Sequence, residues 1–195
     1  MSVDHFWRRL PGQAVDACSP EELGELVPRS RDVRYDRLVA AGLALGVRHT
    51  AVLMELALTE NGLHPDPAAR LPVYGGTRTD RADQIDGGER ADRGDRVDRG
   101  DRVDRGGAGE HGDAGMLVLR PEQVAAAFTF LRDSALGELV RQQDTVLARR
   151  VAQLGSEPPW SESWAARVVH DLRELRDFFA VAAAAGDAII VRESE

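Results

Sequence analysis

A repeat of aspartate, arginine and glycine interrupts this chain and sets the main constraint on its fold. From Asp80 to Asp104 an acidic residue stands at every third position, and arginine follows most of these acids. The segment has too few apolar side chains to offset the ~1–2 kcal/mol per residue that ordering a backbone costs. We therefore predict a disordered low-complexity insert over 77–115, and a single domain over 1–195 that is built from 1–76 and 116–195.

A calcium-binding aspartate repeat is the functional alternative for this insert. Such repeats follow a nonapeptide period with apolar strand positions. Here the period is three, and an arginine beside nearly every aspartate would repel a cation. The composition therefore favours a solvated loop.

Composition excludes several classes of protein. All 25 basic residues are arginine, so chemistry that needs a lysine amine is excluded. The 33 acidic residues leave a net charge of -8, which argues against a nucleic-acid partner. Cys18 is the single cysteine, so neither an internal disulfide nor a cysteine metal site can form. No apolar run is long enough to cross a bilayer and the first residues do not resemble a signal peptide, so we expect a cytoplasmic protein with no membrane partner.

Helix and strand patterns on both sides of the insert predict an α+β fold: one helix-dominated domain with a small sheet of short strands. Before the insert we expect a strand at 3–10, a helix capped by Ser19 and ended by Pro28, one or two helices within 35–58, a loop at 64–67 and a short strand at 71–76. After it we expect a strand at 116–119, a helix from Pro121, a helix capped by Ser134 and ended by Gly155, a long helix from Ser161 to Gly186, and a strand at 188–191. The long helix has the clearest pattern, because its apolar residues recur at steps of three and four: Trp164, Val168, Leu172, Leu175, Phe179 and Ala182.

Several segments together are typical of one known family. They are Phe6–Pro11, Tyr74–Gly76, Leu117–Val124, Leu139–Asp144, Leu172–Phe179 and Gly186–Ala188. The chain resembles the YfbM-like proteins, small bacterial proteins with a domain of unknown function, although Arg120 stands where that family usually has a threonine cap. The resemblance implies a compact α+β domain and supplies no catalytic residues.

Candidate catalytic and metal-binding side chains have simpler explanations. His170 and Glu174 lie four residues apart on the long helix and could bind one metal, but the arginines and acids around them favour solvated or ion-paired side chains. Ser19, Ser134 and Ser161 are explained as helix caps, and Cys18 as a small buried residue. We therefore predict no catalytic residue, no metal site and no cofactor.

Trp160 and Trp164 are the candidates for a binding surface. Trp160 follows two prolines just before the long helix, where it is either an exposed aromatic anchor or a residue that packs back on Trp164. The leading hypothesis is a non-catalytic protein-interaction or regulatory module whose partner docks near Trp160, Trp164, His170, Glu174 and the ends of the insert. The alternative is a small hydrolase or ligand-binding enzyme that uses carboxylates and His170 in a cleft between 1–76 and 116–195. The sequence leaves the oligomeric state open.

Overall fold

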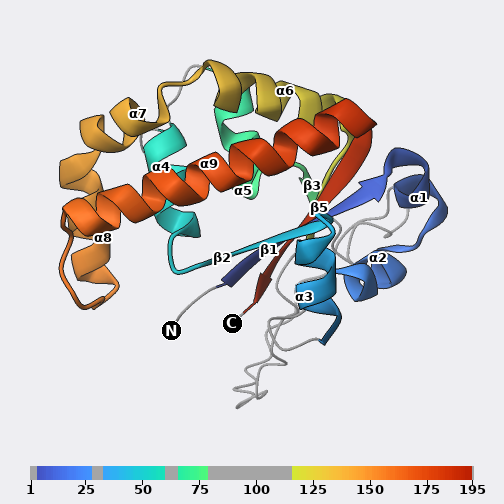
Figure 1. Cartoon of the computed structure of the whole chain (residues 1–195), viewed down its shortest axis with the longest axis horizontal. Coiled ribbons are helices and arrows are strands. Elements are labelled where there is room, and N and C mark those ends of the chain that lie inside the picture. Colours follow the sequence, from blue (N-terminus) through green and yellow to red (C-terminus); the bar gives the residue numbers. More distant parts are fainter. Residues whose placement is uncertain (1–3, 28–32, 60–65, 79–115, 195) are drawn as a thin grey trace, which may run out of the picture.

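The first and last strands of the chain pair along their whole length. In the computed structural model, which describes residues 4–27, 33–59, 66–78 and 116–194, β1 (Asp4–Pro11) lies antiparallel to β5 (Asp187–Ser194). β2 (Ala44–Arg48) pairs with the other edge of β1, and β4 (Met116–Leu119) and the two-residue β3 (Thr77–Arg78) continue from β5. The order is β2-β1-β5-β4-β3, so one antiparallel sheet combines strands from both sides of the insert (Figure 1).

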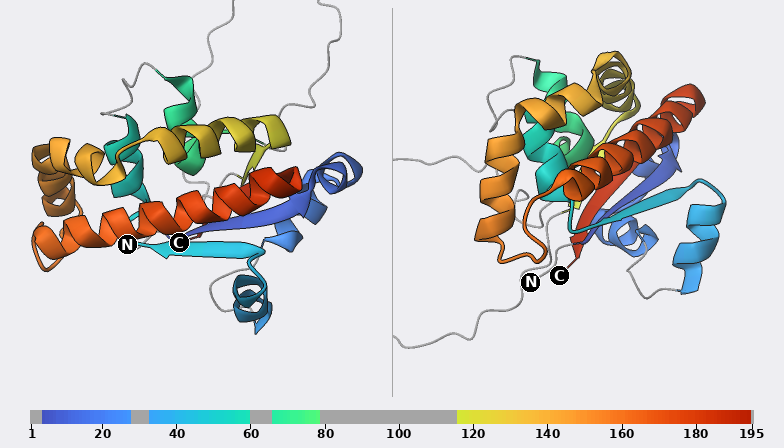
Figure 2. Two further views of the ribbon diagram at one scale, coloured as in Figure 1. Left: turned by 45° about the horizontal axis from the view of Figure 1, so that its top comes forward. Right: turned by 60° about the vertical axis from the view of Figure 1, so that its left-hand side comes forward.

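Helices cover both faces of this sheet. One face carries α4 (Ala51–Thr59), η1 (Pro67–Arg70), α5 (Leu71–Tyr74), α6 (Pro121–Asp133), α7 (Leu136–Gln142), α8 (Asp144–Gln153) and α9 (Glu162–Ala185). The other face carries α1 (Gly12–Ala17), α2 (Pro20–Leu26) and α3 (Val33–Ala40), as the two views of Figure 2 show. Side chains alternate along each strand, which gives the sheet two apolar faces. Trp7 and Ile189 belong to the larger core under α4–α9, and Phe6 and Ile190 belong to the smaller core under α1–α3.

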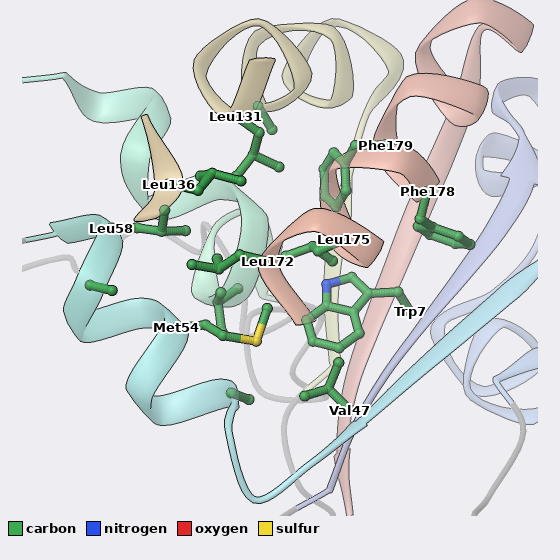
Figure 3. Packing of buried hydrophobic residues seen from close by; sticks show 14 of the residues in the cluster. Trp7, Val47, Met54, Leu58, Leu131, Leu136, Leu172, Leu175, Phe178 and Phe179 are labelled. Carbon is green, nitrogen blue, oxygen red and sulfur yellow. The ribbon is translucent and has the colours of Figure 1, made fainter. Parts of the chain in front are cut away.

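The larger core forms around the Trp7 indole. Trp7, Val47, Leu172 and Leu175 are all buried and gather where α9 crosses the sheet (Figure 3). Indole Nε1 donates a hydrogen bond of 2.8 Å to the carbonyl oxygen of Pro72, so the buried polar atom is satisfied. This bond also ties β1 to α5.

The long C-terminal helix is confirmed. In α9 the predicted apolar stripe is buried from Val168 to Ala182, with Trp164 half-buried at its start. Gly186 ends the helix at φ 67°, the left-handed conformation in which glycine has no Cβ to strain. The strands predicted at 3–10, 116–119 and 188–191 and the Ser19 capping box of α2 are also confirmed.

Two helices, α3 and α4, lie in the region where one or two were predicted within 35–58, but the prediction is wrong between them. Ala44–Arg48 forms β2, which separates α3 from α4. Leu45 and Val47 alternate with Gly46, as residues of a strand do. The run is too short for its sequence alone to distinguish a strand from a helix. Gly46 fits here because Tyr35 of α3 and Phe6 of β1 come so close that a Cβ would meet both rings.

The strand predicted at 71–76 is also wrong. Leu71–Tyr74 is a single helical turn that continues from η1, which Asp66 caps by accepting from the Ala68 N–H at 2.8 Å. Proline is tolerated in a first helical turn, so Pro72 does not oppose it. The neighbouring strand comes later, at Thr77–Arg78, inside the predicted insert. The rest of that insert, 79–115, and residues 64–65 of the loop predicted at 64–67 lie outside the described residues.

Ser134 does not cap the next helix. Its hydroxyl donates a hydrogen bond of 2.6 Å back to the Phe130 carbonyl oxygen, and Ser134 is the C-cap residue of α6. α7 begins at Leu136, and a break at Gln143 divides the single predicted helix into α7 and α8. A serine hydroxyl can bond the preceding turn as well as the following one, which is why sequence spacing alone misassigned it. No helix within the described ranges is long and apolar enough to cross a membrane.

Candidate functional site

The two predicted tryptophans lie on either side of the start of α9. Both are half-buried and pack against the larger core. Trp160 Nε1 donates a hydrogen bond of 2.7 Å to Asp144 Oδ1, and Trp164 Nε1 donates one of 2.9 Å to the Pro158 carbonyl oxygen. Each indole is therefore held in one orientation, and each residue is still partly exposed.

The segment that holds these indoles also carries an exposed apolar residue and two exposed acids. Leu154, at the end of α8, is 43% exposed. We call Leu154, Trp160 and Trp164 the α8–α9 surface. The segment 154–164 also carries exposed Glu157 and Glu162 and contains no basic residue.

His170 and Glu174 are both exposed on α9. Across 4–27, 33–59, 66–78 and 116–194, no three histidine, cysteine, aspartate or glutamate side chains are placed to hold a metal ion together. Asp171, between these two residues in sequence, is instead buried, and it accepts from Thr50 Oγ1 at 2.6 Å and from Arg167 Nε at 3.2 Å. The role of His170 and Glu174 in a partner surface stays a prediction.

A second group of polar side chains converges from four different elements. It consists of His5 of β1, Glu55 of α4, Tyr74 of α5 and Glu193 of β5, which we call the His5 cluster. His5 is 0% exposed, and its Nε2 lies 2.9 Å from Glu193 Oε1. The Tyr74 ring meets the imidazole edge-on at 5.2 Å between centroids, and its hydroxyl donates to Glu193.

Burial changes the acid–base properties of this cluster. It raises the pKa of Glu55 to about 7, an effect that the charge of Arg70 partly opposes. Burial, followed by the charges of Glu193 and Glu55, also raises the pKa of the Tyr74 phenol, while Arg150 acts in the opposite direction. A carboxyl with a pKa near neutrality can both give and take a proton at physiological pH.

The chemistry open to the cluster depends on which groups solvent can reach. Glu55, Tyr74 and Glu193 are each partly exposed, whereas His5 has no accessible surface. His5 therefore positions Glu193, while Oε2 of Glu55 is itself enclosed. Sequence reasoning missed this group because its members come together only through the pairing of β1 with β5 and the packing of α4 and α5.

A cavity of about 590 Å³ opens at the other end of β1 and β5. It is lined by the starts of α1 and α6 and by the turn after α9. Three of its four charged lining residues are already paired, since Arg120 lies 2.7 Å from Asp16 and Asp187 lies 2.9 Å from Arg9; Glu122 is the fourth. The cavity therefore has less to offer a charged ligand than the His5 cluster.

The architecture defines an α+β class with a five-strand antiparallel sheet whose two outer layers are helical. This is the fold of YfbM from Escherichia coli, a protein of unknown function whose crystal structure aligns with 98% of this chain and 99% of its own at a TM-score of 0.54. Sequence identity over the alignment is 13%, so the likeness is one of fold. The YfbM-like resemblance read from the sequence is confirmed at that level. The sequence matches no protein-family model and no curated protein.

Proposed function

We propose that the chain is a non-catalytic interaction module of the cytoplasm that binds a protein partner through the α8–α9 surface. The observation that carries this proposal is that Trp160 and Trp164 are each partly exposed while hydrogen bonds fix both indoles. Tryptophan is enriched among the residues that dominate binding energy. A side chain that is already held in place loses little entropy when a partner covers it.

Charge gives the chemistry of the partner. The segment 154–164 carries Glu157 and Glu162 without a basic residue, and the whole chain has a net charge of -8. Complementary charge speeds association and excludes wrong partners. The partner therefore presents an apolar side chain between basic residues.

Trp160→Ala tests this proposal. The full chain and the variant are cross-linked in the native host, and captured proteins are identified by mass spectrometry. Binding of the captured partner is then measured with purified proteins. We expect Trp160→Ala to weaken it at least about 30-fold, the loss typical of a central aromatic residue.

Val181→Ala is the matched control for this experiment. Val181 is 53% exposed on the same helix, ~25 Å along α9 from Trp164 by the helical rise. Its substitution should leave binding unchanged. A folded Trp160→Ala protein that binds every partner as tightly as the wild type would contradict the proposed surface.

Acid–base chemistry at the His5 cluster is the second candidate function, as a small hydrolase. The observation that favours it is the pKa of Glu55 near 7 beside the Glu193 carboxylate and the Tyr74 phenol. His5 takes the place of His170 in this hypothesis, since His170 is exposed on α9. A panel of ester, amide and phosphoester substrates tests this hydrolase hypothesis. Activity should be lost in Glu55→Gln and kept in Glu174→Gln. If the wild type turns over none of these substrates, the hypothesis is ruled out for them.

A further inference from the structure

The loop between α8 and α9 presents two adjacent prolines to solvent. Pro158 and Pro159 are both exposed, and so is Glu157 directly before them. Prolines in a loop often serve only to set a turn. The contacts around these two decide whether they can do more.

Hydrogen bonds hold this loop in one conformation. Near its start, the Ser156 N–H donates a hydrogen bond of 3.2 Å to the Val151 carbonyl oxygen at the end of α8. In its middle, the Pro158 carbonyl oxygen accepts from Trp164 Nε1 of α9 at 2.9 Å. The proline rings also fix their own backbone angle φ. A loop that is ordered before it binds loses little entropy when a partner covers it.

The backbone of the two prolines offers a partner no hydrogen-bond donor. Proline has no N–H, and the Pro158 carbonyl already accepts from Trp164. In an added β-strand alternate residues donate to the partner's edge, so Pro158 or Pro159 would fall at a donor position in either register. The loop is therefore unsuited to pairing with the edge of a partner's sheet. The groups that remain for a partner are the two rings and the Glu157 carboxylate.

We propose that the loop 157–159 enters a groove of a protein partner that is lined by aromatic side chains and flanked by basic residues. This inference rests on the proposed function, since it specifies what the partner of the α8–α9 surface presents there. Aromatic grooves recognise rigid, apolar proline rings without needing backbone donors from them. The exposed carboxylates of Glu157 and Glu162, in a segment 154–164 without a basic residue, account for the basic flank.

Site-specific photo-cross-linking of the full chain tests what lies against the loop. p-Benzoylphenylalanine replaces Ser161, an exposed residue two positions after Pro159, and in a control variant it replaces Val181, exposed far along α9. Both variants are irradiated in the native host, and the partner peptide that carries the cross-link is sequenced by mass spectrometry. We expect the probe at Ser161 to attach to a peptide that contains both aromatic and basic residues, and the probe at Val181 not to attach to it.

Binding of the cross-linked partner to purified variants gives the second measurement. Pro159→Ala should weaken it at least about tenfold, as loss of a central contact residue does. Pro20→Ala is the matched control, an exposed proline in the first turn of α2 on the other side of the sheet, and should leave binding unchanged. Glu157→Gln should make the association rate less sensitive to salt, because it removes one of the charges that attract a basic partner.

Two results would overturn the inference and leave the proposed function in place. One is a cross-linked peptide that lacks aromatic residues or lacks basic ones. The other is a folded Pro159→Ala protein that binds as tightly as the wild type while Trp160→Ala does not, because the partner would then dock on the α8–α9 surface without holding the loop. If the probe at Ser161 captures no protein beyond those captured at Val181, the inference and the proposed function both fail.

Discussion

Glu193 lies opposite His5 across the β1–β5 pair, with its Oε1 atom 2.9 Å from the imidazole Nε2. The contact joins the first strand to the last at a point where His5 has no solvent contact. Tyr74 and Glu55 complete the group from α5 and α4. The same four side chains therefore hold the sheet to its helical layer and make the stability of the protein sensitive to pH.

Glu55→Gln should make the protein more stable at alkaline pH. The Glu55 pKa is about 7 in the folded protein, raised by burial from the ordinary glutamate value of 4.5, so folding favours the protonated carboxyl. The unfolded chain then binds fewer protons between these values, and the wild-type free energy of unfolding falls as pH rises from 4.5 through 7. At pH 8 we expect the variant to be more stable by about 1–3 kcal/mol, a range that allows for partial exposure.

Urea denaturation across the pH range checks this expectation. The two proteins should have equal stability at about pH 4 and diverge above it. Glu174→Gln, at an exposed position, is the control and should run parallel to the wild type. A Glu55→Gln curve with the same pH dependence as the wild type would contradict the raised pKa.

Thr50→Val should destabilise the junction between α4 and α9. The Thr50 hydroxyl donates a hydrogen bond of 2.6 Å to the carboxylate of Asp171, and both residues are buried. Valine keeps the shape but leaves one carboxylate oxygen without this donor, at a cost of about 1–3 kcal/mol. Chemical denaturation measures the change, and Thr50→Ser, which keeps the hydroxyl, should recover most of it. Equal loss in both variants would show that the methyl group matters and the hydrogen bond does not.

Gly46→Ala should loosen the packing of α3 on the sheet. An added Cβ would overlap the Tyr35 hydroxyl and approach the Phe6 ring at 3.1 Å, so we expect a loss of about 1–3 kcal/mol in thermal or urea unfolding. Combining it with Tyr35→Phe removes the oxygen that clashes, and the double variant should lose less than the sum of the single ones. Gly24→Ala is the control: nothing lies within 4 Å of its added Cβ, and a helical alanine should stabilise by about 0.5–1 kcal/mol.

Replacing residues 80–115 by Asn-Gly should leave the domain intact. Thr77 pairs with Val118 and Arg78 with Leu117, so the next pair along this register would be 79 with 116, and a two-residue turn would close it as a hairpin. The composition of the insert predicts that it adds no core, and we expect a melting temperature within a few degrees of the wild type. A large drop would mean that the insert packs against the domain.

Local patterns predicted local structure well. The apolar stripe of α9, its end at Gly186 and the capping box at Ser19 each depend on residues within a few positions, so the sequence was sufficient. The errors occurred where a short segment fits two structures. Leu45 and Val47 are apolar enough for either a helix or a strand, and β2 forms because β1 provides its hydrogen-bonding partner.

The sequence by itself determined the helices with strong periodicity, the α+β class, the limits of the repeat and the absence of lysine chemistry, because these depend on composition and on neighbours along the chain. Only the tertiary structure decided that His5 meets Glu193 and that the pKa of Glu55 rises to about 7. Each of these depends on strand register and burial, which join residues far apart in the chain. A shift of one residue in the β1–β5 pairing would exchange the two faces of a strand and separate them all.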